Sequence, residues 1–175
     1  MNRDLKPFEW TEDLRKYQEL LEDSAKSNSN WPILNEGNEH AAILMTTIFK
    51  HATQYVYMYS NSFNTDITSY DIYYEALKGC IERQVKVEVL LKDKPKANNL
   101  SLQLIKDSNK GSVRVLNSFQ YDTLTKVLNS ENINFAVADD KIYRLEYDTE
   151  KRKATSSFNA ANIAEVLKEK FMSVN

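Results

Sequence analysis

The residues able to do acid–base or metal chemistry are few and scattered along the chain. There are two histidines, His40 and His51, and one cysteine, Cys80. If one helix holds both histidines, its rise per residue places them about 16 Å apart, too far to bind one metal ion at about 2 Å. A lone cysteine excludes an internal disulfide and a cysteine-based zinc site. Neither histidine stands in a nucleophile signature, so a catalytic triad has weak support.

Pairs of carboxylates are the other candidates for such chemistry. Glu146 and Asp148 stand two apart near the end of an expected strand, where their side chains share a face. Paired carboxylates can hold Mg²⁺ or act as acid and base. We interpret the charged stretch from Glu146 to Lys153 as a solvated turn, and Asp139-Asp140 as a turn between two strands. A metal site drawn from Asp139, Glu146 and Asp148 is the alternative.

Aromatic and basic side chains raise a second possibility, a nucleic-acid or phosphate site. Aromatic side chains in a basic groove can bind single-stranded nucleic acid by stacking. The tyrosines here fall on one face of a predicted β-strand and on an amphipathic helix, so we expect them to pack in the core. Several basic residues follow strand ends, where α/β sheets bind ligands. The tyrosines are Tyr55, Tyr57, Tyr59, Tyr70, Tyr73 and Tyr74; the basic residues are Lys92, Lys94, Lys96 and Arg114.

Composition narrows the function classes further. The 175 residues are 42% hydrophobic with a net charge of -2, which excludes a bulk basic field for DNA or an anionic membrane. Three scattered glycines exclude a glycine-rich phosphate cradle. No apolar run approaches the roughly 20 residues of a membrane span, and the N-terminus leads into polar residues. We therefore expect a cytoplasmic protein without membrane contact.

Helical and strand periodicities alternate along the chain and predict an α/β fold with a partly parallel sheet. Residues 1–37 are expected to form an N-terminal helical arm and 38–175 the sheet domain. Residues 62–68 are predicted as a polar loop, with Asn38 and Ser69 as helix N-caps. The predicted helices are 10–26, 38–53, 69–83, 100–107, 119–128 and 160–172; the predicted strands are 54–61, 85–91, 112–116, 134–138, 141–147 and 153–158.

This order of elements, with the runs KHATQYVYMYSNSF and YEALKGCIERQVKVEVLLKD, resembles the opening of phospholipase D-like domains. The run NINFAVADDKIYRLEYD resembles the family's motif strands, and AANIAEVLKEKF its closing helix. The resemblance covers about residues 38–172, with Gln84 where the family usually has glycine. It implies a mixed sheet flanked by helices on both faces.

The family's chemistry is carried by H-x-K-x(4)-D, followed six residues later by G-S-x-x-N. Placed from Asp139, the motif has Asn132 at the histidine position and Asn134 at the lysine position, with Glu146 and Tyr147 at the Gly-Ser positions. A looser placement of the second half on Ser156-Ser157-Phe158-Asn159 has much too long a spacing. A carboxamide can neither attack phosphorus nor supply positive charge to the transition state.

The departure implies a catalytically inactive phospholipase D-like module for binding or assembly, without a cofactor. The family implies a homodimer, and a phosphate or nucleic-acid ligand is the partner its pocket would take. Two alternatives remain: a metal-assisted phosphodiesterase or nuclease that uses the carboxylates, and an α/β protein–protein adaptor whose N-terminal helix binds the partner.

Overall fold

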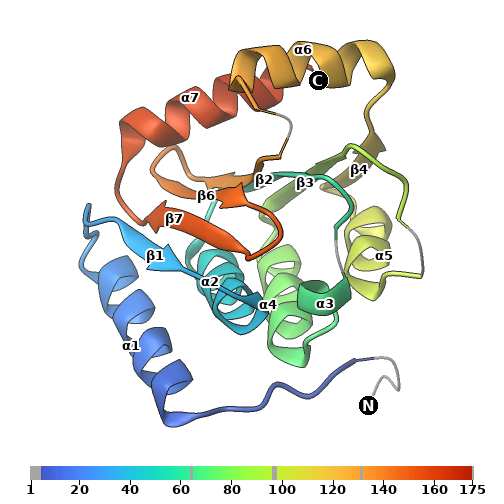
Figure 1. The fold of residues 1–175 in the computed structure, drawn as a ribbon. Coiled ribbons are helices and arrows are strands. Elements are labelled where there is room, and N and C mark those ends of the chain that lie inside the picture. Colours follow the sequence, from blue (N-terminus) through green and yellow to red (C-terminus); the bar gives the residue numbers. More distant parts are fainter. Residues whose placement is uncertain (1–4, 64, 96–97, 131, 175) are drawn as a thin grey trace.

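The computed structural model describes residues 5–63, 65–95, 98–130 and 132–174. Its centre is a seven-stranded sheet of order β1-β7-β6-β5-β2-β3-β4 (Figure 1). The strands are β1 (Ile33–Asn35), β2 (Tyr55–Ser60), β3 (Lys86–Leu91), β4 (Gly111–Val115), β5 (Asn134–Ala138), β6 (Ile142–Asp148) and β7 (Lys153–Ser157). The predicted mixed α/β fold is confirmed.

The sheet has a parallel half and an antiparallel half that meet between β2 and β5. Strands β2, β3 and β4 are parallel, whereas β5, β6, β7 and β1 pair antiparallel. Since β5 runs against β2, with Phe135 opposite Tyr59, the start of β5 lies beside the carboxyl end of β2. That edge therefore collects residues from both halves of the sheet.

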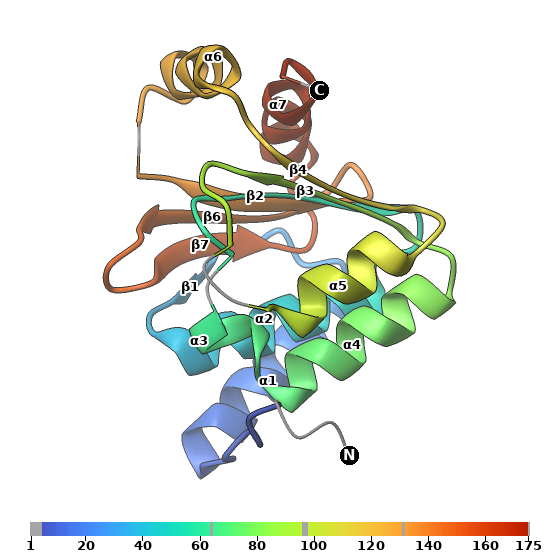
Figure 2. The ribbon, with the colours of Figure 1, turned by 90° about the vertical axis from the view of Figure 1, so that its right-hand side faces the viewer.

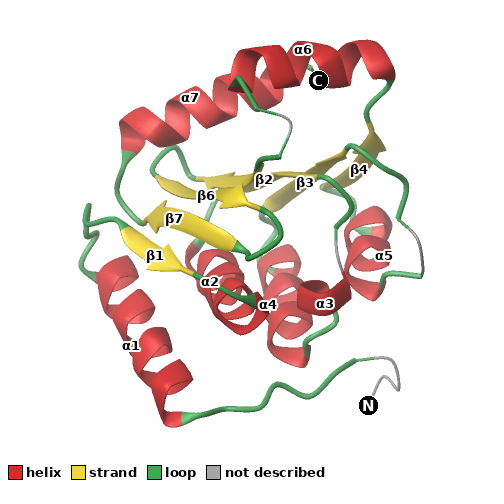
Figure 3. Ribbon diagram, in the orientation of Figure 1, coloured by secondary structure: helices red, strands yellow, loops and turns green. Residues whose placement is uncertain are grey.

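Helices cover both faces of the sheet (Figures 2 and 3). On one face lie α6 and α7; on the other lie α2, α3, α4 and α5, with α1 packed outside α2. Their bounds are α1 (Glu12–Lys26), α2 (Asn38–His51), α3 (Thr65–Thr68), α4 (Asp71–Glu82), α5 (Leu100–Asp107), α6 (Ser118–Leu128) and α7 (Ala161–Met172). In the described part of the chain, no helix is long and apolar enough to cross a membrane.

Strand β2 shows why both faces must be covered. Its alternate side chains enter two separate hydrophobic clusters: Val56 and Met58 pack toward α2 and α4, and Tyr55, Tyr57 and Tyr59 toward α6 and α7. All five are buried. The expectation that these tyrosines form core rather than a stacking platform is confirmed.

The structure differs from the predicted elements mainly near the N-terminus and after β2. Strand β1 was not predicted, and it joins the sheet edge by pairing with β7. The four-residue helix α3 lies within the predicted loop 62–68. The expected caps were wrong by one residue: α2 follows Gly37, whose φ of 91° favours glycine, and α4 follows Tyr70.

Residues on both sides of position 37 pack together. Leu21 of α1 is fully buried in the same hydrophobic cluster as Leu44 of α2, and Ile33 of β1 joins that cluster too. The division of the chain at residue 37 stays a prediction, although β1 itself is part of the sheet.

Candidate functional site

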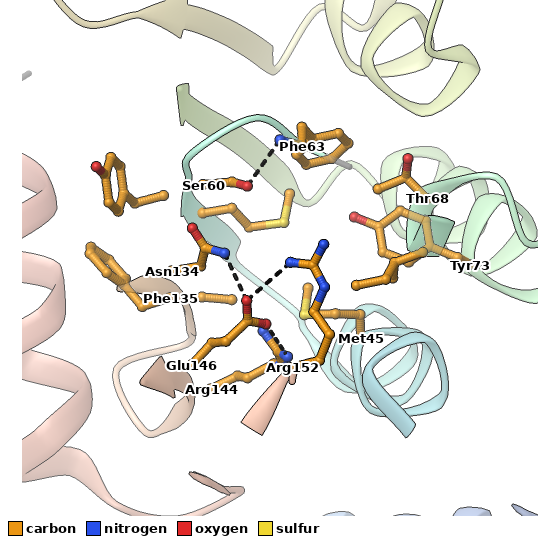
Figure 4. A pocket seen from close by; sticks show the side chains of 14 residues that line it. Met45, Ser60, Phe63, Thr68, Tyr73, Asn134, Phe135, Arg144, Glu146 and Arg152 are labelled. Carbon is orange, nitrogen blue, oxygen red and sulfur yellow. Dashed lines mark hydrogen bonds and ion pairs between the residues drawn. The ribbon is translucent and has the colours of Figure 1, made fainter. Parts of the chain in front are cut away.

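A closed polar network lies at the edge where β5 begins. Asn134 and Glu146 are register partners on β5 and β6, and the Asn134 amide nitrogen donates to Glu146 Oε1 at 2.8 Å. Arg144 donates to Glu146 Oε2 at 2.6 Å, and Arg152 to Oε1 at 3.2 Å. Figure 4 shows the three donors converging on this one carboxylate.

Strand geometry brings these groups together. Arg144 and Glu146 are two apart on β6, so both side chains point to the face that carries α2. The β6–β7 ladder is irregular between Glu146 and Asp148, and the following turn holds Arg152 in a left-handed conformation, φ 56°. The side-chain amide of Asn35 on β1 donates to the Arg152 carbonyl at 2.9 Å. Strand β1 therefore helps to position a site residue.

Burial makes the charges in this network costly to separate. Glu146 is 1% exposed and Arg144 6%, and a buried charge must be paired and hydrogen-bonded. One carboxylate faces two guanidinium groups, so the network carries a formal charge of about +1. Burial raises the pKa of the nearby Tyr73 hydroxyl, and the charge of Arg144 opposes that rise. Tyr73 is therefore a neutral hydroxyl at physiological pH.

A small cavity of about 70 Å³ adjoins the network. Its polar lining includes Ser60 and Thr68, and the network side chains form one wall. Ser60 Oγ accepts from the backbone N–H of Phe63 at 3.0 Å, and Phe63 has a positive φ of 49°. The other lining residues are Met45, Met58, Tyr59, Phe63, Ile67, Tyr73, Phe135 and Ala136.

The structure separates the other predicted site residues from this network. Asn132 is exposed and precedes β5. Asp139 lies at the opposite end of β5, where its carboxylate accepts from the backbone N–H groups of Thr53, Gln54 and Tyr55 at 2.7, 2.8 and 3.2 Å. It is a clamp on the start of β2.

Asp148, the third predicted carboxylate, accepts from the backbone N–H groups of Glu150 and Lys151 in the β6–β7 turn. Asp139, Glu146 and Asp148 are thus not gathered at one point. Within the described ranges, no three histidine, cysteine or acidic side chains form a group able to hold a metal ion.

Both histidines lie away from the cavity lining. His51 Nε2 contacts Glu22 of α1 at 2.8 Å, and His40 packs against Tyr17 with ring centroids 4.3 Å apart and the ring planes tilted by 33°. In the looser motif placement, Ser156 lies opposite Arg144 on β6, but Asn159 donates to the backbone carbonyl of Asn28.

The interpretation of Glu146 as part of a solvated turn was wrong, because the residue lies within β6 on the face that the helices cover, where it is buried. Arg144 and Arg152 were not singled out from the sequence. The signal was the R-L-E triplet of β6, which puts opposite charges on one strand face. Of the predicted basic residues, Lys96 lies outside the described residues; Lys92 and Arg114 are at the carboxyl ends of β3 and β4.

Comparison with solved structures identifies the fold. No protein-family model matches the chain, and no curated protein matches its sequence. Nuc of Salmonella typhimurium, a phospholipase D family member, aligns with a TM-score of 0.55 at 15% identity, over 82% of this chain and 93% of Nuc. NucT of Helicobacter pylori aligns with a TM-score of 0.59 at 16% identity, over 82% and 94%.

A third similar structure has a different role. The archaeal chromatin protein TrmBL2, described as having a novel mode of DNA binding, aligns with a TM-score of 0.52 at 17% identity. That alignment covers 92% of this chain and 59% of TrmBL2. At these identities the likeness concerns the fold. The phospholipase D-like fold expected from the sequence is confirmed.

Proposed function

We propose that this chain is a non-catalytic phospholipase D-like module that acts in binding or assembly, as a cytoplasmic homodimer. The observation that carries the proposal is the contact between Asn134 and Glu146. By the motif placement, Asn134 stands where an active relative has its lysine, and Glu146 where it has the glycine of its Gly-Ser pair. A neutral amide there replaces the lysine's positive charge, and the Glu146 carboxylate engages both neighbouring guanidinium groups, so neither is offered to a phosphodiester alone.

The side chains around the cavity support the same conclusion. Hydroxyl groups of Ser60, Thr68 and Tyr73 line it, and a hydroxyl becomes a nucleophile only beside a general base. The lining has no histidine. Its carboxylate, Glu146, is bound to two guanidinium groups and an amide, so its oxygens already accept hydrogen bonds from neighbours rather than from a nucleophile.

Hydrolysis assays test the loss of catalysis. The full chain is incubated with bis-p-nitrophenyl phosphate, single-stranded DNA and RNA, in EDTA and with Mg²⁺ or Mn²⁺. We expect no turnover above the protein-free control in any condition. Turnover that requires the metal and disappears in Asp148→Asn would establish the metal-assisted alternative, and metal-independent turnover lost in Ser60→Ala would show a replaced nucleophile.

Assembly and ligand class are tested separately. Size-exclusion chromatography with light scattering should give the mass of a dimer, and a monomer at high concentration contradicts the assembly. The DNA binding described for TrmBL2 makes DNA the first ligand to try. Binding should weaken steeply with salt, because phosphate contacts release counterions. If neither DNA nor RNA binds at low salt, the ligand is not a nucleic acid, and the adaptor alternative gains support.

A further inference from the structure

A second polar cluster lies on the other face of the sheet, between α6 and the carboxyl ends of β2–β4. Tyr59 on β2 is opposite Leu90 on β3, and Leu90 is opposite Arg114 on β4. Aligned residues on neighbouring strands project to the same face. Tyr59 and Arg114 therefore flank Leu90 on the face that carries α6, separated by about 10 Å of backbone.

Three polar atoms of this cluster have no hydrogen-bond partner among the described residues. The Tyr59 hydroxyl, the Tyr121 hydroxyl and one terminal nitrogen of Arg114 are buried and make no hydrogen bond to any described residue. Tyr59 is 2% exposed. Buried polar groups are nearly always satisfied, and leaving one unsatisfied is destabilising. Tyr121 lies close enough to Tyr59 to raise the pKa of its hydroxyl, and the strand register puts Arg114 on the same face, so the three unsatisfied groups belong to one region of this face.

The chemistry of the cluster selects an anion. Arg114 carries a permanent positive charge, and the ammonium group of Lys92 lies 4.6 Å from the centre of the Tyr121 ring. Both tyrosines are hydroxyl donors, and burial raises the pKa of Tyr59, with the charges of Tyr121 and Asp93 acting in the same direction. Two cations and two neutral hydroxyls are suited to the oxygens of a phosphate group.

Helix α6 covers the cluster but is lightly attached to it. Leu124 is its one fully buried residue among those described, and Phe119 is 79% exposed. The capping box at Asn117 and Gln120 satisfies the first backbone N–H groups of the helix from within its own sequence. In Figure 2 the helix lies above the sheet and beside α7. Hydrogen bonds from Gln120 to the Val174 carbonyl at 3.0 Å and from Lys170 to the Val127 carbonyl at 2.5 Å join α6 to the C-terminal segment, so entry of a ligand beneath α6 would require the helix to shift together with that segment or to break these bonds.

We propose that the cluster formed by Tyr59, Arg114 and Tyr121, with Lys92 at its rim, is a binding site for a small phosphate-bearing molecule covered by α6. The site is on the opposite face of the sheet from the Asn134–Glu146 network, so it does not depend on the proposed function. Asp93 opposes the anion and limits its affinity.

Inorganic phosphate is the probe, titrated by calorimetry into the full chain at constant ionic strength, up to about 20 mM, well above a Kd of about 1 mM. We expect saturable binding. Arg114→Gln, Tyr59→Phe and Tyr121→Phe should each weaken it about tenfold or more, since each removes a hydrogen bond to a charged ligand. Asp93→Asn should tighten it. Tyr57→Phe, on the same face of β2 but stacked on Phe171, should bind as the wild type does.

The same variants separate binding from packing. Without phosphate, Tyr59→Phe should unfold at the same temperature as the wild type or higher, because it removes an unsatisfied hydroxyl. Phosphate also stabilises proteins non-specifically, and this contribution is common to all variants; the additional rise from specific binding should be absent in Arg114→Gln.

Four results overturn the proposal. The first is absence of saturable phosphate binding, and the second is wild-type affinity in Arg114→Gln. The third is loss of binding in Arg152→Gln with retention in Arg114→Gln, which places the anion in the other cavity. The fourth is a lower unfolding temperature for Tyr59→Phe without phosphate. That result would show that the Tyr59 hydroxyl already has a stabilising partner, such as a buried water.

Discussion

Glu146 lies 2.6 Å from Arg144 in an ion pair whose side chains are almost completely buried. The pair is formed within one strand, from residues two apart, and it is completed by Arg152 from the next turn and Asn134 from the neighbouring strand. Both oxygens of the Glu146 carboxylate are thus satisfied by neighbouring side chains, whereas Arg144 Nε has no hydrogen-bond partner among the described residues. That is the arrangement of a structural network, and it supports the proposal of a non-catalytic module.

Truncating Glu146 should be severely destabilising. Glu146→Ala leaves Arg144 and Arg152 without their carboxylate, and breaking a buried pair by removing one partner costs about 3–5 kcal/mol. Urea unfolding followed by circular dichroism measures the loss. The matched control is Glu12→Ala, which removes an exposed partner of Lys16 and should change stability by about 0.5 kcal/mol or less. Equal effects of the two substitutions would contradict the buried network.

Asp139 should act as a structural clamp and not as a metal ligand. Its carboxylate also accepts from the Thr53 hydroxyl at 2.8 Å, and hydrogen bonds to a charged acceptor contribute about 1.5–3 kcal/mol each. Asp139→Ala should therefore lower the free energy of unfolding by about 2 kcal/mol or more. Asp139→Asn should lose less, because asparagine keeps one acceptor oxygen and tolerates the φ of 52°.

Thermal unfolding with and without Mg²⁺ completes the Asp139 test. The wild type and Asp139→Asn should unfold at temperatures that Mg²⁺ leaves unchanged. If Mg²⁺ instead raises the unfolding temperature of the wild type but not that of Asp139→Asn, Asp139 is a metal ligand, since a bound metal stabilises the folded state.

The contact between α1 and α2 should weaken in acid. Partial burial alone would raise the pKa of the Glu22 carboxyl, but the hydrogen bond and charge of His51, with Lys50 and Lys26, hold it below its ordinary value of 4.5. A carboxyl with a lowered pKa in the folded state stabilises fully above the unfolded pKa, and this contribution is lost as the pH falls through the folded pKa.

The free energy of unfolding of the wild type should therefore exceed that of Glu22→Gln at pH 6, and the difference should shrink below about pH 4.5. In a His51→Gln background, the difference in the free energy of unfolding should depend less on pH, because His51 makes the largest contribution to lowering the pKa of Glu22. A difference that stays constant from neutral pH into acid contradicts the assignment.

Local patterns predicted most of the elements because each is decided by its own periodicity. Helix α5 begins and ends where its apolar spacing placed it, at Leu100 and Asp107, and β2 was predicted as buried on both faces. Strand β1 could not be found in this way. Its three residues bond to β7, with Leu34 opposite Thr155, so nothing near Leu34 in the sequence indicates a strand.

The polar site could not be predicted from the sequence for a related reason. The run EYDTEKRK, which begins at Glu146, is as highly charged as a typical exposed turn. Glu146 is buried by tertiary contacts with residues outside its own strand, which include the ion pair with Arg152. The motif placement identified Asn134 and Glu146 as candidate site residues from their spacing to Asp139. Their direct contact required the β5–β6 register, which spacing alone does not give.

The N-terminal segment should be required for folding, although residues 1–37 were predicted as an appended arm. A chain of residues 38–175 lacks Leu21, which is fully buried, and exposes the edge of β7 that β1 covers. Unpaired edges and uncovered apolar faces promote aggregation. We expect the truncated chain to be aggregated or unfolded, as judged by circular dichroism and light scattering.

Two neighbouring leucines provide a sharper form of the same test. Leu21→Ala should cost about 2–5 kcal/mol, since it leaves a cavity between α1 and α2. Leu20→Ala is the control, because Leu20 is 52% exposed and exposed substitutions change stability by about 0.5 kcal/mol. If the arm is merely appended, Leu21→Ala will resemble Leu20→Ala and residues 38–175 will unfold cooperatively at the temperature of the full chain. A large loss for Leu21→Ala alone makes α1 part of the folding unit, and a partner that binds through α1 must then use its outer face.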